Sequence, residues 1–392
     1  MGEPAGKVQG KAEHAGPPVV PLELFFDLVF VFVLSQITHA IEDDLSPYGI
    51  GRGLIYLLLV WSAWVGFAWV GNAHRAEDRS DGGIPRRLII IAAMAVLIAL
   101  GLVVPEAGQD ITAESAAVLY LALFILYAGD FLLATRGDPA MRRTVLRLLA
   151  IQSILPLILL VVGFGDWGAW DLILVGSGLL IAYVAPALTP DTDWQFSAAH
   201  ADERFSLLML IVLGESLISV GLGAADNPFG WPVVATICLG VLIVAALWWQ
   251  YFDLLSHQGE AYLESLEPAE RIRKARLIYS YLHVLLVVAV ILMALGLTAA
   301  SSDPDLPLSS PQATFLPGGI ALFLLTLAVI RRVMRGRVLW PLPLAALGTL
   351  LVIPLAYVLP ALASEAICVV ILGTLVTARE IYKRRGVIQP IH

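Results

Sequence analysis

The sequence is poor in charge and in cysteine. Only 14% of its 392 residues are Asp, Glu, Lys or Arg, against roughly 25% in an ordinary soluble domain. Its two cysteines, Cys238 and Cys368, lie inside apolar runs, which argues against a disulfide framework or a Cys-x-x-Cys metal site. Walker, Rossmann, Gly-x-Ser-x-Gly and His-Glu-x-x-His patterns are missing, so no cofactor and no resident metal are predicted. Residues 1–18 lack the apolar stretch of a cleaved signal peptide.

Long apolar runs dominate what remains. Hydrophobic residues make up 59% of the chain, and the mean hydropathy is +0.83. A membrane-spanning helix needs about 20 apolar residues, and twelve segments qualify: 20–41, 52–72, 86–104, 114–134, 143–163, 168–188, 203–222, 231–255, 276–299, 315–334, 338–358 and 361–381. The sequence therefore predicts an all-α, polytopic integral membrane bundle with the lipid bilayer as its first partner. Nothing indicates nucleic-acid binding, and the oligomeric state is left open.

The basic residues alternate between the predicted loops. With the N-terminus in the cytoplasm, 23 of the 24 Lys and Arg residues fall on the inner side, and only Arg52 falls outside. The positive-inside rule then favours twelve spans with both termini cytoplasmic, in the inner membrane of a bacterium.

Two halves of the chain share short patterns. The predicted helix at 203 begins Glu-Arg-Phe-Ser-Leu-Leu, and the one at 20 contains Glu-Leu-Phe-Phe-Asp-Leu from Glu23. Two parallel six-helix repeats are a known transporter plan. The predicted units are a disordered cytoplasmic N-terminus (1–18), a first repeat (19–188), a linker (189–202), a second repeat (203–381) and a tail (382–392). The charged connection 256–275 suits a short surface helix or a solvated linker.

Glu23 and Asp27 lie four residues apart at the start of a helix that is otherwise apolar on every side. Charges there are costly and need a partner, a proton, an ion or a substrate. At about 1.5 Å per residue, Asp27 would lie roughly 10 Å from the inner end of its helix, and Glu215 about 16 Å beyond Arg204. Either acid could bind an ion or exchange protons. A buried pair of Asp27 with Arg147 or Arg204 is the structural alternative, and a protonated Glu bonded to a neighbouring helix is the alternative for Glu215.

Other ionisable residues fall in the inner half of the predicted spans. They suggest one hydrated cavity open to the cytoplasm, with Glu215 at its floor. The candidate ion, proton or substrate residues are Asp27, Glu215, His283, Glu23, Glu203, Arg204, Asp253 and Asp130. Glu23 and Glu203 could instead mark helix starts, where carboxylates favour the positive end of the dipole. His200-x-x-Glu203 has the spacing of a bundle metal motif, but a second such pair is missing.

Four motifs carry a family resemblance. They are the run from Pro21 to Phe32, His200-x-x-Glu203-Arg-Phe, Leu213-Gly-Glu-Ser216 and Tyr279-Ser-Tyr-Leu-His283. With them the chain resembles the bacterial low temperature requirement A family over nearly its whole length. The resemblance implies a polytopic inner-membrane protein and maps the family's polar positions to Glu23, Asp27, Glu203, Arg204, Glu215 and His283. It implies no particular substrate or reaction.

Three functions fit these residues. The preferred one is a transporter or channel for a small cation or polar solute. The second is a membrane enzyme acting on a lipid or isoprenoid-like substrate, with Phe25, Phe30, Trp61 and Trp64 around the site. The third is a structural or regulatory membrane protein whose buried charges hold the repeats together.

Overall fold

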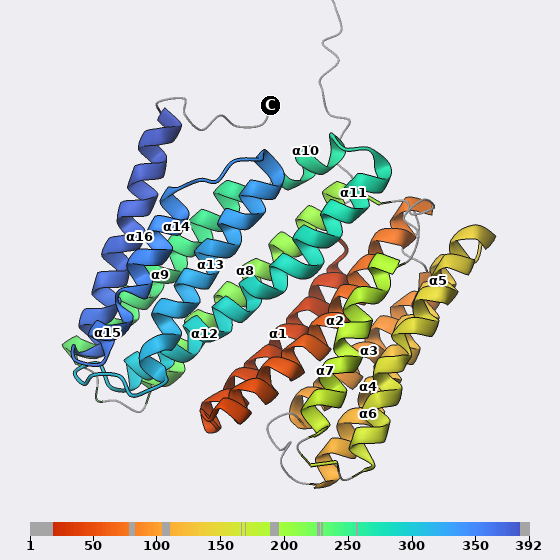
Figure 1. The fold of residues 1–392 in the computed structure, drawn as a ribbon, viewed down its shortest axis with the longest axis horizontal. Coiled ribbons are helices and arrows are strands. Elements are labelled where there is room, and N and C mark those ends of the chain that lie inside the picture. Colours follow the sequence, from red (N-terminus) through yellow and green to blue (C-terminus); the bar gives the residue numbers. More distant parts are fainter. Residues whose placement is uncertain are drawn as a thin grey trace, which may run out of the picture.

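The computed structural model describes residues 19–77, 83–103, 110–165, 167, 168, 170–188, 196–225, 228, 230–255 and 258–384. Every regular element among them is a helix (Figure 1). The predicted N-terminal segment 1–18 lies outside the described residues, and so do residues 385–392 of the predicted tail.

The first half of the chain forms seven α-helices and a short 3₁₀ helix: α1 (Pro21–Asp43), α2 (Pro47–Glu77), α3 (Gly83–Val103), α4 (Asp110–Ala134), α5 (Pro139–Gln152), α6 (Ile154–Gly163), α7 (Trp170–Val184) and η1 (Ala185–Leu188). Helix α5 begins where Asp138 accepts hydrogen bonds from the backbone of Ala140 and Met141. It gives way to α6 around Ser153 because Pro156 has no N–H for the carbonyl four residues earlier.

The second half contains α8 (Ala198–Ala224), α9 (Trp231–Leu255), α10 (Gln258–Glu264), α11 (Pro268–Ala275), the π-helix η2 (Arg276–Leu282), α12 (His283–Ser302), α13 (Gln312–Arg335), α14 (Pro341–Leu350), α15 (Ile353–Ala356) and α16 (Ala361–Arg384). Helices α10 and α11 confirm the helical alternative for the connection 256–275. Helix α13 ends at Gly336, whose φ of 67° is the left-handed conformation favoured after a helix.

Eleven helical segments of the described chain are long and apolar enough to cross a membrane. They correspond to eleven of the twelve predicted spans. The exception is 338–358, which folds as the shorter apolar segment Pro341–Ala356. Pro354 interrupts it, again by removing a helical donor.

The predicted linker 189–202 ends earlier than expected. Ser197 caps α8, and its hydroxyl oxygen accepts from the backbone N–H of His200 at 3.3 Å. His200 therefore belongs to a helix, and its side chain is buried. Residues 189–195 lie outside the described part of the chain.

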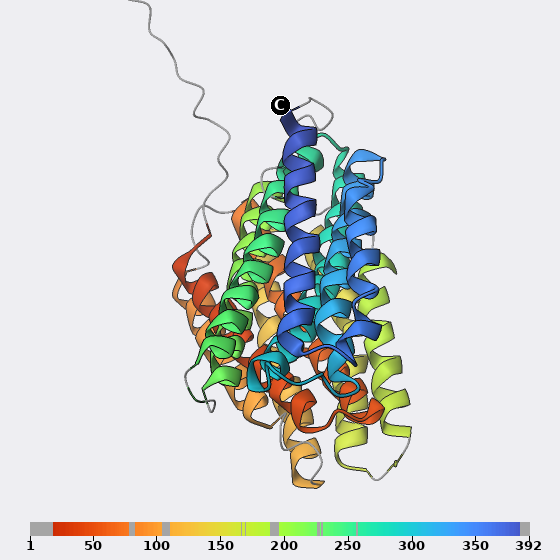
Figure 2. The same cartoon turned by 90° about the vertical axis from the view of Figure 1, so that its left-hand side faces the viewer.

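The two halves of the chain have the same order of neighbours. In the first, α1 packs on α2 and α3, α3 on α4, α4 on α6, α6 on α7, and α7 on α2. In the second, α8 packs on α9 and α12, α12 on α13, α13 on α14, α14 on α16, and α16 on α9. Figure 1 shows the first group on the right and the second on the left, and Figure 2 shows the helices running roughly along one direction.

The halves meet along α1, α8 and α12. The segment Pro268–Ser302, which ends in α12, and helix α13 are the most buried of the candidate spans. Their backbones approach closely, since a Cβ on Gly319 would lie 2.7 Å from the carbonyl oxygen of Ala289. Large apolar side chains such as Phe25, Leu88 and Leu217 are exposed on the outside, as expected for a surface that faces lipid.

Candidate functional site

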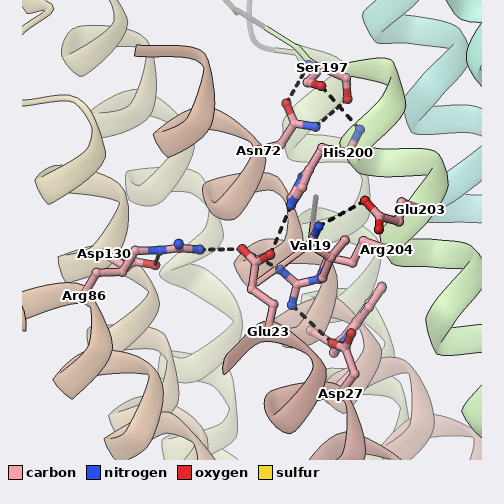
Figure 3. Close-up of polar contacts among 11 residues, drawn as sticks. Val19, Glu23, Asp27, Asn72, Arg86, Asp130, Ser197, His200, Glu203 and Arg204 are labelled. Atoms are coloured by element: carbon pink, nitrogen blue, oxygen red, sulfur yellow. Dashed lines mark hydrogen bonds and ion pairs between the residues drawn. The ribbon is translucent and has the colours of Figure 1, made fainter. Parts of the chain in front are cut away.

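A cluster of buried charged side chains lies where the two halves of the bundle meet (Figure 3). Glu23 at the start of α1 is its centre. One carboxylate oxygen, Oε1, lies 2.8 Å from Nη2 of Arg86 on α3 and 3.5 Å from Nη1 of Arg204 on α8. The other, Oε2, lies 3.1 Å from Nε2 of His200 on α8. These four side chains are at most 3% exposed.

Asp27, one turn further along α1, extends the cluster. Its Oδ1 accepts from Nη2 of Arg204 at 3.2 Å and from the indole Nε1 of Trp64 at 2.7 Å. The Arg204 guanidinium also lies over the Trp64 ring, 5.5 Å from its centroid. Asp130 near the end of α4 lies 3.8 Å from Arg86 Nε. We call Glu23, Asp27, Arg86, Asp130, His200 and Arg204 the charge cluster.

Local sequence explains why these side chains meet. Pro21 occupies the first turn of α1, and Glu23 lies in that turn, where the helix dipole favours a carboxylate. Glu23 and Asp27 then share a face by the four-residue spacing. Gly71 on α2 makes room for them, because a Cβ there would lie 2.7 Å from Glu23 Oε1 and 3.1 Å from Arg204 Nη1.

The charges of the cluster are nearly balanced. It contains three carboxylates, two guanidinium groups and one imidazole. Its formal charge is therefore −1 with His200 neutral and zero with His200 protonated. A buried ion pair is stabilised only when its geometry and extra hydrogen bonds offset the loss of hydration. Two small cavities touch the cluster at Arg204, one beside Glu23 and Arg86 and one beside His200 and Asn72.

Four of the eight predicted site residues belong to this cluster: Glu23, Asp27, Asp130 and Arg204. The pairing of Asp27 with Arg204, the structural alternative, is present, whereas Arg147 is exposed on α5. Glu203 is exposed and accepts from the backbone N–H of Val19 at 3.0 Å. It therefore fixes the chain just before α1.

The other predicted residues lie apart from the charge cluster. Glu215 is half-buried on α8 and lines a small cavity with Thr38 of α1. Asp253 on α9 lies 3.4 Å from Nη2 of Arg379 on α16. Among the described residues, Glu215 and the charge cluster border different cavities, and one cavity with Glu215 at its floor stays a prediction.

His283 begins α12 and is fully buried. Its Nε2 lies 3.0 Å from the Tyr251 hydroxyl, and its Nδ1 lies 2.8 Å from the carbonyl oxygen of Ile278. The Phe205 ring lies between this histidine and the cluster, 5.2 Å from the His283 ring and 4.9 Å from the Trp64 ring. An aromatic layer therefore separates His283 from the charges.

Sequence reasoning missed several residues of these sites. Arg86 was counted only among the basic residues on the inner side. Nothing in the sequence distinguishes it from its neighbour Arg87, which is also a basic residue at that helix start. Trp64 was placed only in the aromatic pocket of the enzyme alternative, and Gly71 carried no motif. Glu365 on α16 also escaped notice. It is fully buried, and neither carboxylate oxygen has a hydrogen-bond partner among the described residues.

The spacing of His200 and Glu203 suggested a metal motif, but the described residues do not bring these two side chains together around one point. His200 Nε2 is directed at Glu23, while Glu203 binds the Val19 backbone. In the described chain no group of three or more His, Cys, Asp or Glu side chains is placed to hold a metal ion.

A larger cavity lies beside α2 in the first half. It has about 1020 Å³ of empty volume, and its walls include Trp61, Tyr120, Tyr127 and Arg276. Trp61 was expected in an aromatic pocket, but Phe25 is exposed on the surface instead. The described residues that line this cavity include no carboxylate, so acid chemistry by Asp27 or Glu215 would not take place there.

The fold and the charge cluster define a class: a polytopic helical membrane protein with ion pairs buried between its halves. Within that class, the chain belongs to the bacterial low temperature requirement A protein (LtrA) family, whose family model matches residues 18–377. The match confirms the resemblance predicted from the motifs. The chain is also similar to uncharacterized protein RA0937 of Rhizobium meliloti (strain 1021), with 29% identity over 293 residues that cover 70% of this chain and 67% of that protein.

Proposed function

We propose that the protein is a transporter for a small cation or polar solute and that the charge cluster is its coupling site. The observation that carries the proposal is the burial of three carboxylates, two guanidinium groups and an imidazole between the halves of a membrane bundle. Ionisable groups at such positions are rare and typically mark ion or proton pathways.

The proposal includes the membrane arrangement. We infer twelve spans in two parallel six-helix repeats, with both termini in the cytoplasm of a bacterium and the protein in the inner membrane. The identical order of helix neighbours in the two halves supports the repeats. The distribution of 23 of 24 Lys and Arg residues supports the orientation. Pro341–Ala356 would complete the twelfth span although proline interrupts it, because neighbouring helices can satisfy the freed backbone groups.

The cluster would work by exchange of partners. In the described conformation Arg204 contacts both Glu23 and Asp27 of α1. When α8 moves relative to α1, Glu23 and Asp27 lose this cation and require a proton or a solute cation in its place. Glu215 and Thr38 line a cavity among α1, α8 and α12 further along the same interface, and this cavity would be a second polar site for the solute.

A matched pair of variants tests this function. In proteoliposomes, Asp27→Asn and Glu215→Gln should each abolish solute-driven flux of protons or cations, while Glu380→Gln should not. Glu380 is a suitable control because its pair with Arg384 is exposed. Unchanged flux in both Asp27→Asn and Glu215→Gln would reject the proposal.

The pairing of Asp27 with Arg204 favours a second candidate, a structural or regulatory membrane protein in which the cluster locks the halves together. If the cluster is only a lock, Asp27→Asn lowers the unfolding free energy and the wild-type protein shows no transport. A transporter predicts lost flux also in those variants that keep wild-type thermal stability. Measuring both quantities on the same preparations separates the two functions.

A further inference from the structure

The cavity beside α2 is built from two parts of the chain far apart in sequence. Most of its wall comes from α2, α4, α5 and α7, and η2 of the second half closes one side through Arg276, Ser280 and Tyr281. Its empty space of about 1020 Å³ includes the open mouth of the cavity, and clefts with mostly apolar walls and a few polar groups are typical small-molecule sites. It is distinct from the charge cluster, since no member of the cluster lines it.

The inner wall of the cavity is apolar in effect. Its tyrosine hydroxyls are already bonded: Tyr120 lies 2.8 Å from the Ser62 hydroxyl, and Tyr127 donates to Gln152 at 3.1 Å. The ring faces of Trp61, Phe124 and these tyrosines remain to contact a ligand. Such a surface favours a hydrophobic body, and unsaturated or flat groups pack well on aromatic faces.

One end of the cavity is lined by an arginine, Arg276. Arg276 begins η2 and is half-buried. Wide π-helical turns recur at functional sites, and this one is anchored to the cavity wall. Trp61 donates to the carbonyl oxygen of Ser280 at 2.8 Å, and Trp69 donates to its hydroxyl at 2.9 Å. The guanidinium is therefore presented on a fixed element, and guanidinium groups bind phosphate in a bidentate geometry.

We infer that this cavity binds a lipid phosphate, with the phosphate at Arg276 and the apolar chain among the rings of α2 and α4. On the proposed topology Arg276 lies at the cytoplasmic side, where basic pockets between helices bind anionic head groups. The chain could come from a glycerophospholipid or from a polyprenyl phosphate, because both present a phosphate on an apolar body. The inference does not rest on transport, because binding needs no flux.

Photo-cross-linking of the full chain in phosphatidylcholine nanodiscs tests the site. The probes are diazirine-bearing phosphatidylglycerol, polyprenyl phosphate, phosphatidylcholine and polyprenol, and adducts are located by peptide mass spectrometry. Each negatively charged probe is compared with its uncharged counterpart: phosphatidylglycerol with zwitterionic phosphatidylcholine, and polyprenyl phosphate with neutral polyprenol. In at least one of the two comparisons the charged probe should label peptides of α2, α4 and η2 about tenfold more, because one charge-assisted contact is worth about that factor. The stronger of the two identifies the source of the chain.

Variants make the result specific. Arg276→Gln should remove that preference, whereas Arg273→Gln, an exposed neighbour on α11, should keep it. Ala63→Trp fills the cavity and should abolish labelling by every probe. If that variant does not fold, Ala182→Leu serves the same purpose. Equal labelling by charged and neutral probes, wild-type labelling of Arg276→Gln, or adducts spread evenly over the lipid-facing helices would overturn the inference.

Discussion

Replacing Arg204 with methionine probes the charge cluster most directly. The guanidinium of Arg204 lies 3.2 Å from Asp27 and 3.5 Å from Glu23, and its loss leaves two carboxylates without that cation. At an effective dielectric constant of about 20, each contact corresponds to roughly 5 kcal/mol of Coulomb attraction before desolvation. Glu23 keeps Arg86 at 2.8 Å, so the damage concentrates on Asp27.

The expected cost of Arg204→Met is about 3–5 kcal/mol of unfolding free energy, the range for removing one partner of a buried pair. The double variant Asp27→Leu/Arg204→Met removes both charges of the pair. Because well-packed apolar substitutes for a buried pair are often neutral, it should recover most of that loss. The coupling energy between the two positions should therefore exceed about 2 kcal/mol.

These differences in unfolding free energy are measured by unfolding the protein in mixed detergent micelles and monitoring the loss of helix. Glu380→Gln serves as the control, because its exposed pair with Arg384 should contribute less than about 1 kcal/mol. Strict additivity of Asp27→Leu and Arg204→Met would refute the reasoning, since it would mean that the two side chains do not interact.

Three further predictions address single contacts, each measured as the change in unfolding free energy. Gly71→Ala should be destabilising because its Cβ would lie 2.7 Å from Glu23 Oε1, whereas Gly129→Ala has nothing within 4 Å and should be neutral. Trp64→Phe should cost about 1.5–3 kcal/mol because its indole donates to a carboxylate, and Trp61→Phe about 0.5–1.5 because its acceptor is a carbonyl. Glu365→Leu should stabilise by about 1 kcal/mol or more, since both buried oxygens lack partners among the described residues.

Helix positions were predictable because hydrophobic length is a strong signal. A run such as 203–222 can only be buried in lipid or protein, and eleven of the twelve runs form candidate spans. The segment 338–358 forms a shorter helix for a local reason. Proline interrupts it, and average hydropathy does not register a lost hydrogen-bond donor. Helix starts were less certain, and α8 begins at Ala198 rather than at residue 203.

The site was predictable only in part. Helical periodicity placed Glu23 and Asp27 on one face, and the low number of intramembrane cations left Arg147 and Arg204 as the possible partners of Asp27. Arg86 was hidden because a basic residue at a helix start also satisfies the positive-inside rule. Gly71 was hidden because a close approach between side chains from three other helices is a tertiary property. Depth alone grouped Glu215 and His283 with the cluster, but depth carries no information on which helices are neighbours.

The position of the charge cluster constrains any conformational change between the halves. Separation of α8 from α1 at this level would break the contacts of Arg204 with Glu23 and Asp27, at about 3–5 kcal/mol for a buried pair left open. Shifting a two-state equilibrium from 1:99 to 99:1 takes about 5.5 kcal/mol, which is similar in size. A proton or cation that binds the released carboxylates offsets that cost only in the separated state, and a ligand shifts an equilibrium by its differential affinity for the two states. The same pairs that lock the described conformation would therefore couple its opening to the occupant of Glu23 and Asp27, so a lock and a coupling site are two consequences of one arrangement.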